Sequence, residues 1–437
     1  MGHFLFLLAT AALFVRPAEI FPAVQDWPIY EFLILACLAV SLPGVFKQLS
    51  IASFVENPIT ACIMCLWVAV VLSHLVHFVL WGATMSGFRF FKIVVYYLLL
   101  VAHVDSEEHL RGFLRWLLLL ITLLAAIALL SAHDIIKLPD IDFYEQRQHD
   151  DATGQTIIIP RLRGTGIFND PNDLAMILVL GVAMAMYVVA DPSAGILRPL
   201  GLAQAGLFGY AIYETQSRGG LLALLAALAT LCYVRWGWKR TALVAAIALP
   251  ALLVGVEGRM TNIDDAMGKG TAQSRVQLWS AGVQLFRHQP VFGIGQGSYA
   301  EEVGQVAHNS FLHAFTELGF VGGAFFLGTF TAALLMLRRL RDDEMLAEDR
   351  SELMRMLPYL MAMLVGFVVS MLSLSRNYFV PTYLVLGVAT SYVQIATGQT
   401  GLLPLKFDSW FLKRLAVGSV CFLAAIYVFV RVTVQWS

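Results

Sequence analysis

Four arginines and one histidine stand beside long apolar runs, where polar groups are unusual. Arg218 directly precedes such a run in "TQSRGGLLALLAAL", and Arg275 begins the amphipathic segment "RVQLWSAGVQLFRHQP". Arg161 and Arg163 belong to "RLRGTGIFNDPNDLA", which leads into another apolar run. A guanidinium presents several N–H donors in a planar fork that suits phosphate oxygens. The four arginines are therefore candidate contacts for an anionic, phosphorylated substrate.

Each arginine also has a structural interpretation. Arg218 could lie at a membrane interface with its charged end in water, or it could add to the positive end of a helix whose N–H groups bind an anion. The glycines that follow Arg218 would let a ligand approach the backbone. Arg275, behind Ser274 as a possible N-cap, would lie in the first helical turn, where a cation opposes the helix dipole. For Arg161 and Arg163, solvation of a loop remains as open as anion binding.

The histidine lies in "HNSFLHAFTELGFVGG", residues 308–323. Asn309, His313 and Glu317 recur every four residues and would share one helix face. We interpret His313 and Glu317 as a polar, hydrogen-bonded seam between helices. His308 lies at the edge of this stripe and at the water interface, where a proton can leave. Because histidine is the usual general base near neutral pH, His308 is the candidate catalytic residue.

The sequence gives no motif for a metal or a cofactor. No His, Cys, Asp or Glu grouping has metal-ligand spacing, and Cys62 and Cys65 read as small core residues of an apolar helix. Asp170 before Pro171 predicts a helix N-cap rather than a calcium ligand. The glycines of "GIGQG" (293–297) predict a turn and not a nucleotide-binding loop, since no strand precedes them.

The elements that must position these residues are membrane helices. The chain has 437 residues, of which 59% are hydrophobic and only 14% charged, with a mean hydropathy of +0.73. A typical soluble protein carries about 25% charged residues. With about 20 apolar residues needed for each span, we predict an all-α integral membrane protein, a polytopic bundle of about 12–13 transmembrane helices. We expect residues 1–437 to form a single integral membrane domain. The net charge of −1 gives no indication of a nucleic-acid partner.

Basic short loops predict the orientation of the bundle. Lys and Arg cluster at 235–240, 338–355 and 412–414, which we assign to the cytoplasm. The spans we predict are 2–15, 29–46, 58–80, 88–104, 109–131, 172–190, 196–214, 218–235, 240–256, 308–337, 356–374, 379–396 and 412–433. Threading them alternately assigns the long loops 132–171 and 257–307 to the opposite side. Arg161, Arg163, Arg218, Arg275, His308 and Arg376 all fall on that non-cytoplasmic side.

Four segments in this order resemble the O-antigen ligase family: "RLRGTGIFNDPNDLA", "SRGGLLAL", "SRVQLWSAGVQLFRHQPVFGIGQGSY" and "HNSFLHAFTELGFVGG". The resemblance covers residues 160–330, including the loop 257–307. The superfamily also contains O-antigen polymerases and protein O-oligosaccharyltransferases. The resemblance implies a multi-pass protein of the bacterial inner membrane, with a large periplasmic loop before a late helix. It therefore assigns the two long outer loops of our threading, and the active site, to the periplasm. It also implies glycan transfer from an undecaprenyl-diphosphate carrier without a metal or cofactor.

The resemblance also implies roles for the candidate residues. Arg218 and Arg275 match arginines that hold the diphosphate, and Arg161 and Arg163 are carried over with them. His308 matches the histidine that activates the acceptor hydroxyl. The expected partners are an undecaprenyl-diphosphate-linked glycan donor, a glycan or lipid A core acceptor, and membrane lipids. One departure concerns the C-terminus, which our threading leaves outside and the family has inside.

Several functions fit these patterns. An O-antigen ligase-like enzyme would use lipid A core as its acceptor, whereas an O-antigen or exopolysaccharide polymerase would use another glycan chain. A protein acceptor is a third option. A transporter of an anionic substrate would need charges deep within several spans. The middles of the predicted spans are nearly free of charge, which favours the enzyme.

Overall fold

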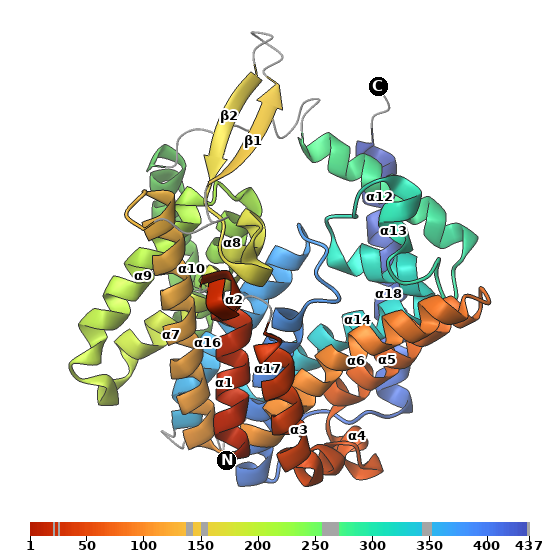
Figure 1. Ribbon diagram of the computed structural model, residues 1–437, viewed down its shortest axis with the longest axis horizontal. Helices are drawn as coiled ribbons and strands as arrows, with labels where there is room; N and C mark the ends of the chain where they lie inside the picture. Colours follow the sequence, from red (N-terminus) through yellow and green to blue (C-terminus); the bar gives the residue numbers. More distant parts are fainter. Residues whose placement is uncertain are drawn as a thin grey trace. The chain divides into compact units, whose positions relative to one another are not determined.

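The computed structural model describes residues 1–20, 22–24, 27–136, 143–149, 156–255, 271–342 and 352–434. These residues are almost entirely helical, and the only sheet among them is one hairpin (Figure 1). Nine of the described helices are long and apolar enough to cross a membrane. The prediction of an all-α polytopic membrane protein is therefore confirmed. The chain forms two compact units: unit 1 comprises Met1–Val40, Glu108–Thr261 and Arg355–Ser370, and unit 2 comprises Ser41–Glu107, Asn262–Met354 and Met371–Ser437.

Unit 1 combines long apolar helices with the β-hairpin. Its long helices are α1 (Gly2–Val15), α7 (Glu107–Ala132), α8 (Pro171–Ala190), α9 (Leu197–Glu214), α10 (Arg218–Gly255) and α16 (Glu352–Met371), and α3 (Ile29–Gln48) runs from unit 1 into unit 2. Short helices are α2 (Pro17–Ile20), η1 (Pro22–Val24), η2 (Gly166–Phe168) and η3 (Pro192–Ala194). The strands β1 (Tyr144–His149) and β2 (Thr156–Arg161) pair antiparallel.

Helix α8 is the most deeply buried span of unit 1 and packs against α9 and α10. It begins at Pro171, and the Asp170 side chain accepts hydrogen bonds from the N–H groups of Asn172 and Asp173. This confirms the predicted N-cap. Helix α7 packs against α1, where the Trp116 indole donates to the Leu7 carbonyl at 3.0 Å.

Unit 2 is built around α14 (Ser310–Arg341), which packs against α5 (Pro58–Leu75), α12 (Thr271–His288), α17 (Val380–Thr400) and α18 (Ser409–Thr433). Helix α6 (Leu80–His103) lies beside α5 and α17, and the short helices are α4 (Ile51–Glu56) and α13 (Ser298–Val303). The buried Tyr97 hydroxyl joins three helices through Thr60 at 2.7 Å and Thr390 at 3.0 Å. Polar contacts of this kind hold apolar helices in one register.

The predicted spans correspond closely to helices, but fewer helices meet the requirements of a membrane span. Gly237 interrupts α10 with φ 78 and ψ 172, at the point where the sequence predicted two separate spans. Helix α1 has only 14 residues, and α9 and α17 are not among the nine described helices that are long and apolar enough to cross a membrane. Helix α10 counts as one of these nine helices, whereas the sequence predicted two spans there. The hairpin was not predicted, although the β-branched run "TIII" of β2 is typical of a strand.

Candidate active site

Helix α14 is broken at Gly319, whose φ of 64 and ψ of −166 suit glycine alone. A break leaves backbone groups that a continuous helix would pair. The N–H of Phe320 donates to the carbonyl of Pro290 at 2.7 Å. The N–H of Val321 donates to the carbonyl of Val291 at 3.2 Å. The segment after α12 therefore completes the hydrogen bonding of the broken helix.

The same segment also pairs with the other side of the break. Ile294 donates its N–H to the Thr316 carbonyl at 3.1 Å, and Gly295 donates to the Glu317 carbonyl at 3.0 Å. Gly293 has a φ of 73, and a Cβ there would lie 2.3 Å from the carbonyl of Glu317. The "GIGQG" segment is thus the predicted turn, and it packs directly on the backbone of α14.

His308 lies just outside α14, which begins at Ser310 and not at residue 308 as predicted. Its φ of 49 is left-handed, which is uncommon for a residue other than glycine. Asn309 is the N-cap, and its Oδ1 accepts from the N–H groups of Phe311 and Leu312, both at 3.1 Å. Asn309 therefore caps the helix, and the predicted polar stripe begins one turn later.

Helix α12 brings Arg275 into the neighbourhood of His308. The indole Nε1 of Trp279 donates at 2.8 Å to the carbonyl of Ala307, the residue directly before His308. Arg275 lies four residues before Trp279, and such pairs are neighbours on a helix face. The prediction of Ser274 as N-cap is wrong, because the preceding residues are already helical and α12 starts at Thr271. Arg275 consequently lies beyond the first turn, where the helix dipole opposes a cation less.

Two further hydrogen bonds join α12 to the neighbouring elements of unit 2. The Thr316 hydroxyl donates to the Gly282 carbonyl at 3.2 Å, and the Tyr299 hydroxyl donates to the Leu278 carbonyl at 2.6 Å. Burial, and then the charge of Glu317, raise the pKa of the Tyr299 phenol. Tyr299 therefore stays protonated and keeps its role as donor. These contacts fix α12, and with it Arg275, against the start of α14.

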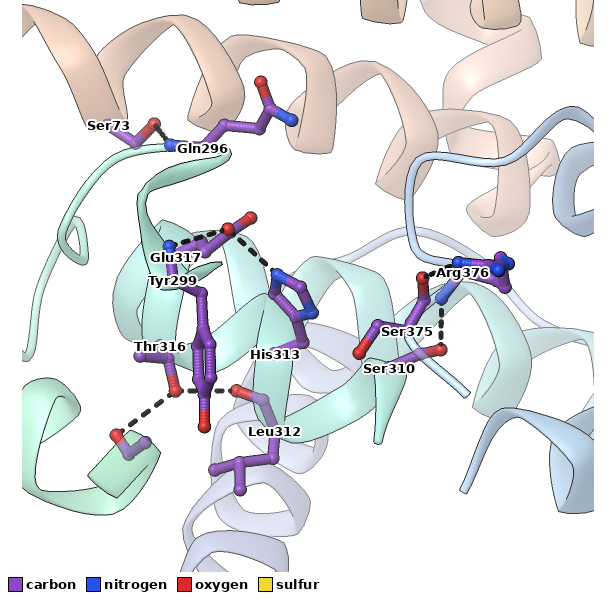
Figure 2. Close-up of polar contacts among 11 residues, drawn as sticks. Ser73, Gln296, Tyr299, Ser310, Leu312, His313, Thr316, Glu317, Ser375 and Arg376 are labelled. Carbon is purple, nitrogen blue, oxygen red and sulfur yellow. Dashed lines mark hydrogen bonds and ion pairs between the residues drawn. The ribbon is translucent and has the colours of Figure 1, made fainter. Parts of the chain in front are cut away.

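Ser310 joins the start of α14 to the turn between α16 and α17. Its hydroxyl donates to the Leu374 carbonyl at 2.6 Å. The same hydroxyl accepts from the backbone N–H of Arg376 at 2.8 Å (Figure 2). We call these two hydrogen bonds the Ser310 bridge. Because Ser310 is two residues after His308, the bridge brings Arg376 into the same region of unit 2.

His313 and Glu317 form the predicted polar seam. His313 Nε2 lies 2.9 Å from Glu317 Oε1, and both side chains are buried (Figure 2). The same carboxylate oxygen accepts from the backbone N–H of Tyr299, in the first turn of α13, at 3.2 Å. Within the described part of the chain, His313 Nδ1 and Glu317 Oε2 have no hydrogen-bond partner. The pair thus ties α13 to α14 as well as pairing internally.

In unit 1, α10 begins at Arg218, as predicted. The Ser217 hydroxyl accepts from the N–H of Gly220 at 3.1 Å and donates to Asn172 Oδ1 at 2.8 Å. A Cβ on Gly220 would lie 2.5 Å from that of Ala175 on α8. Gly220 therefore allows close packing of α10 against α8.

Arg161 is buried and tied into the same end of unit 1. Its guanidinium donates to the Thr215 carbonyl at 2.9 Å, to Gln146 Oε1 at 3.0 Å and to Asn172 Oδ1 at 3.0 Å. The next residue, Leu162, donates its N–H to the Glu214 carbonyl at 2.9 Å. The segment that carries Arg161 and Arg163 therefore runs along the α9–α10 turn, which leads directly into Arg218.

The predicted site residues thus fall into two sets. Unit 1 holds Arg161, Arg163 and Arg218, and unit 2 holds Arg275 and His308, with Arg376 nearby. Sequence reasoning missed the anchoring roles of Trp279 and Ser310. The helical spacing of the amphipathic segment indicates only that Trp279 lies on its apolar face, and nothing in the sequence pattern distinguishes Ser310. Among the described residues, no group of three or more His, Cys, Asp or Glu could hold a metal ion.

Residues 204–327 match the family model described as O-Antigen ligase. The matched segment includes Arg218, Arg275 and His308, whereas Arg161 and Arg163 precede it. No curated protein matches the chain. Together with the nine apolar helices, the match supports a membrane glycosyltransferase of the O-antigen ligase and polymerase superfamily.

Proposed function

We propose that this chain, whose residues 204–327 match the O-antigen ligase family model, transfers a glycan from an undecaprenyl-diphosphate carrier to an acceptor hydroxyl. The reaction takes place on the periplasmic side of the bacterial inner membrane. The acceptor is lipid A core. The positive charge that the reaction needs comes from arginines, so the scheme requires no metal.

In the proposed step, His308 accepts the proton of the acceptor hydroxyl while the hydroxyl oxygen attacks the anomeric carbon of the donor sugar. A new glycosidic C–O bond forms, and the bond between the anomeric carbon and the diphosphate oxygen breaks. The electron pair leaves with the lipid diphosphate, and Arg275 stabilises the growing negative charge. A single displacement of this kind inverts the anomeric centre.

The observation that carries the proposal is the attachment of α12 to the residue before His308. The Trp279–Ala307 hydrogen bond attaches α12 to the residue before His308, and Arg275 lies one turn from Trp279. This supports a base, His308, and a phosphate contact, Arg275, in the same part of unit 2. The family match covers both Arg275 and His308. Arg218, Arg161 and Arg163 are proposed to contribute to diphosphate binding on chemical grounds. Arg218 offers a guanidinium at a helix start, and Arg161 holds the adjoining turn.

The test uses purified full-length protein in lipid nanodiscs with an undecaprenyl-diphosphate-linked glycan. Lipid A core, a free glycan chain and a protein substrate are offered as acceptors, and the products are separated by gel electrophoresis. Transfer to lipid A core is expected, whereas transfer only to the glycan chain would indicate a polymerase.

The key variant is His308→Ala. It is expected to fold normally, because His308 lies outside the helix, and to lower turnover by about 10²–10⁴, the range of a general base. His288→Ala, at the exposed end of α12, is the matched control. Normal turnover by His308→Ala would refute the assignment of the base.

A further inference from the structure

The turn between α16 and α17 carries an arginine that the family match does not include. Arg376 lies in "SLSRNY", outside residues 204–327. Its side chain is partly exposed to solvent. The Ser310 bridge joins its backbone N–H to the start of α14. Two residues and one hydrogen bond thus connect the backbone of Arg376 with that of His308.

The backbone around Arg376 is held on both sides. Its N–H donates to Ser310 Oγ at 2.8 Å, and its carbonyl accepts from the Thr382 hydroxyl at 2.7 Å. The next carbonyl, that of Asn377, accepts from the Tyr383 hydroxyl at 2.7 Å. A segment fixed by its own backbone presents its side chains at a defined place. It also tolerates side-chain replacement, because none of these bonds uses the arginine side chain.

The guanidinium of Arg376 is also supported. Its Cζ lies 5.6 Å from the centre of the Phe379 ring, and its Nη1 donates to the Ser375 carbonyl at 3.1 Å. An aromatic ring beside a guanidinium stabilises the cation. A guanidinium has paired N–H donors of the kind that bind phosphate oxygens.

Residue 308 is therefore flanked by two arginine-bearing elements in unit 2. On one side, Trp279 attaches α12, and with it Arg275, to residue 307. On the other side, Ser310 attaches the turn of Arg376. We propose that Arg376 is a further contact for the donor diphosphate, and that Ser310 is the positioning residue that holds it there. This inference rests on the proposed function, because it assigns Arg376 to the same substrate.

The experiment measures both catalysis and binding by the full-length protein in nanodiscs. Undecaprenyl diphosphate without a glycan serves as a competitive inhibitor, so its inhibition constant reports on diphosphate binding separately from the chemical step. Arg376→Ala is expected to raise this constant roughly ten-fold to a hundred-fold, the range for hydrogen bonds to a charged group. Arg376→Lys keeps the charge but not the fork, and should have a smaller effect. Arg338→Ala, an exposed arginine near the far end of α14, should match the parent.

The role of Ser310 is tested by a double-mutant cycle. Ser310→Ala removes both hydrogen bonds of the bridge and should weaken inhibition in the same direction as Arg376→Ala. If Ser310 acts through Arg376, the double variant should bind the inhibitor no more weakly than Arg376→Ala alone. Fully additive effects would refute the positioning role.

Two outcomes separate this inference from the proposed function. In the first outcome, Arg376→Ala has the parent's inhibition constant for undecaprenyl diphosphate and the parent's turnover, while His308→Ala and Arg275→Ala are impaired. The inference is then wrong and the proposed function stands. If none of the three variants is impaired, the proposed function fails as well. Thermal unfolding of each variant confirms that it is folded, and Arg376→Lys supplies the binding comparison if Arg376→Ala is unstable.

Discussion

The break in α14 makes a quantitative prediction about Gly319→Ala. The residue has a φ of 64, and a Cβ added to it would lie 2.3 Å from the carbonyl of Val291. These neighbouring atoms belong to the backbone, so no side chain can rotate to make room. We therefore expect the segment 290–295 to move away from α14 in this variant.

The expected cost follows from two terms. A residue with a Cβ at these backbone angles, which glycine alone adopts readily, costs about 1–3 kcal/mol. Separation of the segment also loses the hydrogen bonds of Phe320 and Val321 to Pro290 and Val291, each of which contributes about 0.5–1.5 kcal/mol. Gly319→Ala should therefore destabilise the protein by roughly 2–6 kcal/mol. It should also lower turnover, because this segment leads from α12 to α13.

The assay compares thermal unfolding in detergent with glycan transfer. Gly398→Ala in α17 is the matched control, since a Cβ there meets nothing within 4 Å, and it should be neutral or slightly stabilising. Gly293→Ala would place a Cβ against the backbone of Glu317 and Gly319, in the same contact between the two segments. Its effect should be similar to that of Gly319→Ala, and the two should not add. A Gly319→Ala variant as stable as Gly398→Ala would show that the backbone contact does not contribute.

Three further variants test the buried polar contacts by thermal unfolding. Glu317→Ala removes the partner of His313 and the acceptor of the Tyr299 N–H, so it should lower the stability by about 3 kcal/mol. Glu317→Gln keeps an acceptor and should lower the stability less. Equal losses of stability in these two variants would contradict a role for the carboxylate charge. Arg161→Ala removes the donor of the Thr215 carbonyl and of Gln146 Oε1, whereas Asn172 Oδ1 keeps the Ser217 hydroxyl. The expected loss is about 1–3 kcal/mol. Unchanged stability with reduced glycan transfer would instead assign Arg161 to the substrate.

Local patterns in the sequence predicted much of the helical framework. Val276, Trp279, Val283 and Phe286 fall on one helix face, and this spacing predicted α12. The Asp170-Pro171 pair predicted the start of α8. These elements are predictable because the interactions that define them lie within a few residues of each other.

The break in α14 could not be predicted in this way. The apolar run continues across Gly319, and the groups that satisfy the broken backbone come from residues 290–295. Hydropathy does not report such pairing between distant segments. The Trp279–Ala307 hydrogen bond is equally hard to predict. The indole ring fits the apolar face of α12, whereas its N–H donates to a carbonyl 28 residues further along the chain. Residue types in the sequence therefore indicate candidates for chemistry, whereas the contacts that position these candidates depend on distant segments.

The conformation of His308 connects these positioning contacts to the proposed chemistry. A left-handed histidine is held in that region by its surroundings. Here the surroundings are the residues on either side: Ala307 accepts from Trp279, Asn309 caps α14, and Ser310 forms its bridge to the α16–α17 turn. None of these bonds uses the imidazole of His308. The contacts of its neighbours thus hold the backbone from which the His308 side chain extends, which is the kind of support expected of a base that must meet a substrate in a defined geometry.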